Sequence, residues 1–117
     1  MSKAKFSLTI NKREINFNVG VRFLRDYCKK NDCSIEDILL KIQENAFLHT
    51  TYIMYESVCA GNGGKVDFDE DTLVDWIDED SDGFLILKEF IQKLTNYLTN
   101  DVPEEEVDEN VKNSKKK

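Results

Sequence analysis

The spacing of apolar residues changes near residue 20, and this change constrains the fold more than any other feature. Between residues 6 and 19, apolar side chains alternate with polar ones in two short runs. The apolar members of these runs are Phe6, Leu8, Ile10, Ile15, Phe17 and Val19. Alternation is typical of strands with one buried face, and the polar pair Asn11-Lys12 between the runs predicts a tight turn. After Gly20 the spacing becomes helical.

Five helices are predicted after this hairpin, in residues 21–31, 35–42, 47–60, 70–77 and 84–98. Ser34 is a good N-cap, and Asp37 three places later completes a weaker form of the capping box. Asp67 and Asp69 are candidate N-caps for the fourth helix. The third helix has a single acid, Glu56, so we expect it near the centre of the core.

These elements predict an α+β fold, in which an N-terminal β-hairpin packs on a bundle of about five helices. The chain has 117 residues, of which 40% are hydrophobic, and this is enough for one small core. We expect a single domain over residues 1–100. Residues 101–117 are charged and almost without apolar side chains, so we expect this tail to be disordered.

Charge is distributed unevenly along the chain. Residues 1–31 carry eight Lys or Arg against two acids, whereas residues 32–117 carry a net charge of −13. Residues 67–82 contain nine acids and no basic residue. A net charge of −7 argues against nonspecific binding of nucleic acid. We consider three hypotheses for the function. A small nucleic-acid-binding regulator that uses the basic residues 1–31 ranks last among them, because of this net charge.

Composition also bears on compartment and catalysis. No stretch approaches the ~20 apolar residues that cross a bilayer, and no secretory signal is evident at the N-terminus. The chain has an odd number of cysteines, Cys28, Cys33 and Cys59, and one histidine, His49. This composition disfavours a disulfide framework or a zinc site. We find no nucleophile–base pair in the sequence and predict a cytoplasmic protein, reduced and soluble, that is not an enzyme.

The sharpest local pattern is that of an EF-hand loop over residues 78–89. Asp stands at loop positions one, three and five, Gly at six and Glu at twelve, which is the arrangement that supplies oxygen ligands to Ca²⁺. The predicted ligands are Asp78, Asp80, Asp82, the carbonyl of Phe84, and Glu89. A calcium-binding module is therefore the alternative hypothesis, and under any other reading we expect no cofactor.

Three features weaken this match. Loop position nine is Ile86, which offers no oxygen. EF-hands normally work in pairs, and the obvious partner loop has Cys59, Gly61 and Gly63 where carboxylates are needed. The seven residues from 71 to 77 are also too few for an exiting helix, a linker and a second entering helix.

Taken as a whole, the chain resembles the tail assembly chaperones of long-tailed bacteriophages over roughly residues 5–100. The resemblance is carried by the hairpin of residues 6–15, the segment Phe23–Tyr27, the apolar helix Tyr52–Ala60, the segment Asp75–Glu79, and the final helix ending at residues 94–98. The strand–strand–helix order and the Asp-Trp-Ile-Asp segment weigh most. An EF-hand-like loop is not part of the family pattern.

The resemblance implies a small virus-encoded protein made in the host cytoplasm. Members of the family bind the long, aggregation-prone tape measure protein and help tail tube subunits polymerise around it, so the tape measure protein and the tail tube protein are the implied partners. Self-association through an open hairpin edge is a further implication.

Such a protein needs exposed apolar surface to cover its partner and charge to keep the complex in solution. The helix faces of residues 87–98 and 35–42 are the candidates for this surface, although for any single residue of these faces a place in the core is favoured.

Overall fold

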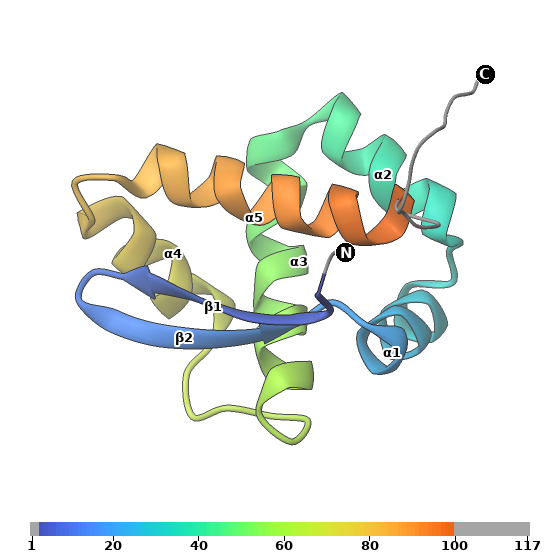
Figure 1. The fold of residues 1–117 in the computed structure, drawn as a ribbon, viewed down its shortest axis with the longest axis horizontal. Coiled ribbons are helices and arrows are strands. Elements are labelled where there is room, and N and C mark those ends of the chain that lie inside the picture. The colour runs from blue at the N-terminus through green and yellow to red at the C-terminus, as the bar shows by residue number, and fades with distance from the viewer. Residues whose placement is uncertain (1–2, 100–117) are drawn as a thin grey trace.

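The computed structural model describes residues 3–99 and consists of a two-stranded antiparallel hairpin followed by five helices. The strands are β1 (Lys5–Ile10) and β2 (Arg13–Asn18). The helices are α1 (Val21–Asn31), α2 (Ile35–Glu44), α3 (Ala46–Gly61), α4 (Glu70–Glu79) and α5 (Gly83–Thr99). The predicted α+β class is confirmed, and Figure 1 shows the hairpin lying against the helices. The predicted tail, residues 101–117, lies outside the described residues.

The hairpin has the register that its alternating pattern predicts. Leu8 pairs with Ile15, and Ile10 pairs with Arg13 across the turn. Asn11 and Lys12 have φ values of 49° and 68°, which is the left-handed backbone of a two-residue hairpin turn. The resulting sheet has one buried face, which packs on the helices.

Helix α3 is the central element, as its low charge predicts. It contacts β2 and each of the other four helices. Ile53, Met54 and Val58 of this helix are almost completely buried. Apolar side chains from all seven elements form one core cluster, which places the described residues around a single hydrophobic centre.

An aromatic group fixes the hairpin to α5. Phe90 is fully buried, and its ring centroid lies 5.4 Å from that of Phe17 and 6.1 Å from that of Phe6. Phe6 also stacks on Phe17 at 5.4 Å. Aromatic pairs at such distances stabilise the fold beyond the burial of their surface. An isolated two-stranded hairpin is only marginally stable, so packing on α5 stabilises this one.

Two helix starts have the caps that the sequence predicts. The Ser34 hydroxyl accepts a hydrogen bond from the Asp37 amide at 3.2 Å, while the Ser34 amide donates to the Asp37 carboxylate at 2.9 Å. The capping box is therefore complete. Of the two candidates before α4, Asp69 is the cap, and it accepts from the amide and hydroxyl of Thr72 at 2.9 and 2.8 Å.

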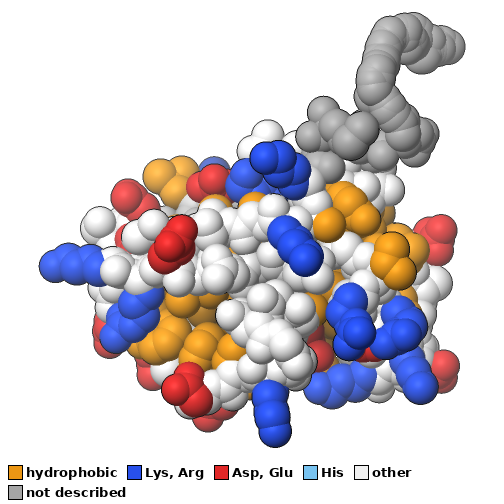
Figure 2. All heavy atoms as spheres, turned by 60° about the horizontal axis from the view of Figure 1, so that its bottom comes forward, with side chains coloured by type: hydrophobic (Ala, Val, Ile, Leu, Met, Phe, Trp, Pro, Cys, Tyr) orange, Lys and Arg blue, Asp and Glu red, His pale blue; other side chains and the backbone are white. Residues whose placement is uncertain are grey.

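The basic helix α1 and the acidic helix α4 lie far apart in the molecule. Helix α1 and the acidic helix α4 lie at the two ends of the long axis in Figure 1. Lys and Arg side chains gather over α1 in Figure 2. Arg25 and Lys30 there lie 3.1 and 3.0 Å from Asp26 and Glu56, respectively. Among residues 3–99, no helix combines the length and apolarity needed to cross a bilayer.

Candidate functional site: an aromatic-rimmed groove

Two phenylalanine rings protrude beside the acidic helix α4. Phe47 lies in the first turn of α3, which begins after the N-cap Asn45, and Phe84 lies in the first turn of α5. The side chains are 65% and 55% exposed, and their ring centroids lie 5.6 Å apart. Two large aromatic side chains in mutual contact and mostly in solvent are more informative than an isolated exposed Leu.

The two rings border a groove between α3, α4 and α5. Its volume is about 420 Å³, and apolar side chains from α4 and α5, namely Val74, Ile77 and Leu87, contribute to its lining. Ile77 is buried, whereas Val74 and Leu87 are half-buried. The groove therefore offers a partly apolar surface that is large enough for side chains from another molecule.

The end of α4 supplies polar groups to the groove. Asp78 and Asp80 line it, and the Asp80 carboxylate accepts hydrogen bonds from the backbone amides of Asn11 and Asp82. These two hydrogen bonds lower the pKa of Asp80, with the Asp82 amide the larger cause. Asp80 is thus ionised at neutral pH and holds the α4–α5 turn against the hairpin turn.

The predicted calcium ligands lie in this same region, but they do not form an EF-hand loop. Asp78 lies in the last turn of α4, which ends at Glu79. Asp80 and Asp82 lie in the turn that follows, whereas Phe84 and Glu89 are already within α5. In an EF-hand, the residues after the central Gly still belong to the ion-binding loop. Within residues 3–99 we find no group of three or more His, Cys, Asp or Glu side chains placed to hold a metal ion. The geometry therefore gives the calcium alternative no support.

Gly83 has a different role from the one that the calcium pattern assigns to it. A Cβ atom at this position would collide with the backbone carbonyl oxygen of Ile77. The glycine therefore allows the start of α5 to approach the end of α4 closely. This close approach also places Phe84 at the edge of the groove.

The two helix faces proposed from the sequence as exposed apolar surface are mostly core. Phe90 and Leu94 in α5 are buried, as are Ile38 and Ile42 in α2. These faces are interior because α5 packs on α3 and β1, and α2 packs on α3. The margin of the α2 face is open, where Ile35 is 40% and Leu40 is 50% exposed.

The exposed pair was missed, although the sequence contains a signal for Phe84. Ile86, Phe90 and Leu94 recur every four residues and form the buried stripe of α5. Phe84 and Leu85 lie off this stripe.

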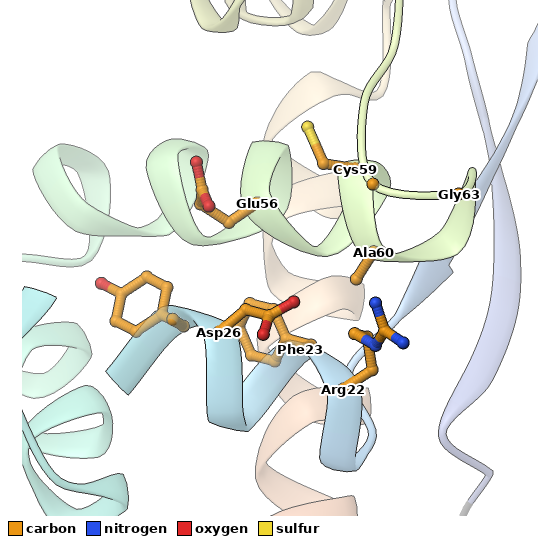
Figure 3. A pocket seen from close by; sticks show the side chains of 9 residues that line it. Arg22, Phe23, Asp26, Glu56, Cys59, Ala60 and Gly63 are labelled. Carbon is orange, nitrogen blue, oxygen red and sulfur yellow. The ribbon is translucent and has the colours of Figure 1, made fainter. Parts of the chain in front are cut away.

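A second cavity, of about 490 Å³, lies between α1 and the end of α3. Figure 3 shows Arg22 and Asp26 extending from α1 toward α3, whereas the sulfur of Cys59 points away from α1. Burial raises the pKa of the Cys59 thiol, and Glu56 accepts a hydrogen bond from Lys30 at 3.0 Å. A protonated thiol is a weak nucleophile, and the lining contains no histidine.

The remaining cysteines and the histidine lie elsewhere. Cys28 and Cys33 are half-buried and pack against the core. Burial is the largest cause of the raised pKa of Cys28. His49 is half-buried on α3 and lines neither cavity. The groove rimmed by Phe47 and Phe84 is therefore the site with the clearest chemical character.

Comparison with known proteins adds no relative to this description. The chain matches no protein-family model, no curated protein and no solved structure.

Proposed function

We propose that this protein is a non-catalytic assembly chaperone that binds an apolar segment of another polypeptide in the groove rimmed by Phe47 and Phe84. The observation that carries the proposal is the exposure of these two rings beside a partly apolar groove. Burying one such side chain contributes about 1.5–3 kcal/mol. Exposed aromatic side chains over a pocket are also typical anchors of protein–protein interfaces.

The resemblance to phage tail assembly chaperones points to the tape measure protein as the partner. In this proposal the groove covers apolar segments of the tape measure protein in the host cytoplasm until tail tube subunits polymerise around it. The excess of acidic residues supports the proposal, since a net charge of −7 helps to keep a complex with a hydrophobic partner in solution.

The experiment is co-expression with the tape measure protein encoded in the same genome, followed by measurement of its soluble fraction. We expect the wild-type protein to increase that fraction and Phe47→Ser/Phe84→Ser to abolish most of the increase. Loss of two aromatic anchors should weaken binding by about tenfold or more. Both side chains are mostly exposed, so the variant should fold normally.

Val21→Ser is the matched control, because Val21 is 75% exposed on α1 and does not line the groove. It should act like the wild-type protein. Equal activity of the double variant, or no effect of the wild-type protein on solubility, would contradict the proposal.

A further inference from the structure

We propose that the segment bound in the groove carries Lys or Arg beside its apolar anchors, so that the groove selects an apolar stretch of polypeptide with basic flanks. The inference rests on the proposed function, because it names the chemistry of what the same groove binds.

Carboxylates border the groove along α4. Asp78 lines it directly, and Asp71 lies seven residues earlier, which is about two helical turns. Side chains at this spacing project from the same side of a helix, and both of these are exposed. Val74, which lines the groove, lies between them in the same stripe. An apolar side chain that reaches Val74 therefore has a carboxylate within one turn on each side.

A further acid lies behind the groove wall. The carboxylate of Glu70 accepts a hydrogen bond at 3.2 Å from the hydroxyl of Thr51, and Thr51 lines the groove. Glu70 is half-buried. Together with Asp80, this gives four carboxylates near one partly apolar surface.

The two basic groups that lie over aromatic rings near the groove form no ion pair with the α4 carboxylates among residues 3–99. The ammonium group of Lys88 lies 4.8 Å from the ring centroid of Phe84. Both residues belong to α5, so this cation lies on the α5 side of the groove. Arg13 lies over the ring of Trp76 at 4.3 Å, and Trp76 does not line the groove. No Lys or Arg occurs in residues 67–82. Helix α4 itself therefore contributes no Lys or Arg side chain to the groove.

A bound segment would strengthen the effect of these charges. When a partner covers the groove it excludes water, and the effective dielectric constant around the carboxylates falls. Lys or Arg beside the apolar anchors would then pair with Asp71 and Asp78, whereas Glu or Asp there would be repelled. The groove would thus discriminate between apolar segments according to the charge that flanks them.

The test uses two synthetic amphipathic helical peptides with the same Leu and Phe positions. One has Lys and the other Glu at the polar positions beside the apolar face, and fluorescence anisotropy measures binding to the full-length protein at low and high salt. We expect the Lys peptide to bind at least about tenfold more tightly, with an affinity that falls as salt rises. Asp71→Asn/Asp78→Asn should weaken its binding by about three- to tenfold and reduce the salt dependence.

Two further variants locate the binding. Phe47→Ser/Phe84→Ser should abolish binding of the Lys peptide, and Asp26→Asn, which removes an exposed acid from α1, should leave it unchanged.

Equal affinity for both peptides at the groove would overturn the inference and leave the proposed function standing. The inference would also be overturned if the Lys peptide bound the Phe47→Ser/Phe84→Ser variant unchanged, since that would be attraction to an acidic protein in general. A third overturning result would be closure of the groove by a second copy of this chain. The co-expression experiment tests the proposed function separately.

Discussion

Asp80 shows how one carboxylate can join parts of the chain that are far apart in sequence. It accepts hydrogen bonds from the amide of Asn11, 69 residues away, and from the amide of Asp82. The sequence places Asp80 correctly in a turn, but its spacing from other acids suggested a metal ligand. Local caps such as Ser34 and Asp69 are predictable because both partners lie within three residues. A contact between two turns has no such local signal.

Substitution of Asp80 should make stability depend less on pH. Because hydrogen bonding lowers its pKa in the folded protein, the stabilising contribution of Asp80 is present above its unfolded pKa, about 3.9. It is lost as pH falls through the lower folded value. We therefore expect Asp80→Ala to have a lower urea midpoint than the wild-type protein at pH 7, and a smaller deficit at pH 3. Equal deficits at both pH values would contradict this role.

The elements themselves were largely predictable, because periodicity is a property of the local sequence. The two strands and five helices lie within a few residues of their predicted positions. The identity of the buried faces was harder to predict. In α5, the stripe of residues 87–98 proposed as open surface includes Phe90 and Leu94, which are buried. An apolar stripe shows which side of a helix is buried, but it does not show whether the cover is the same chain or a partner.

The turn between α4 and α5 should tolerate little extra volume at Gly83. A methyl group there would collide with the carbonyl oxygen of Ile77, so the helices would have to separate. We expect Gly83→Ala to reduce the free energy of unfolding by about 1–3 kcal/mol, as for other overpacking substitutions, measured by urea denaturation.

Ser81→Ala is the control for this turn, because Ser81 is exposed and two residues away. It should change stability by less than about 0.5 kcal/mol. If Gly83→Ala were as stable as the control, the close approach of the two helices would not be required.

At the scale of the described chain, residues 3–99, the basic helix α1 and the acidic helix α4 lie at opposite ends, and the exposed aromatic groove lies beside α4. This separation follows the uneven distribution of charge along the sequence, in which the basic residues precede the acidic ones. The groove was not predictable in the same way. It is built by residues from three helices, and Phe47 and Phe84 are 37 positions apart in the sequence.

This arrangement makes a definite prediction about where a partner binds. Hydrogen–deuterium exchange of the full-length protein, alone and bound to a soluble fragment of the tape measure protein, would locate the contact. We expect the strongest new protection in residues 47–51 and 74–87, which include the groove lining. Protection confined to α1 or to the hairpin, or exchange that the fragment leaves unchanged, would contradict the proposal that this groove holds the partner.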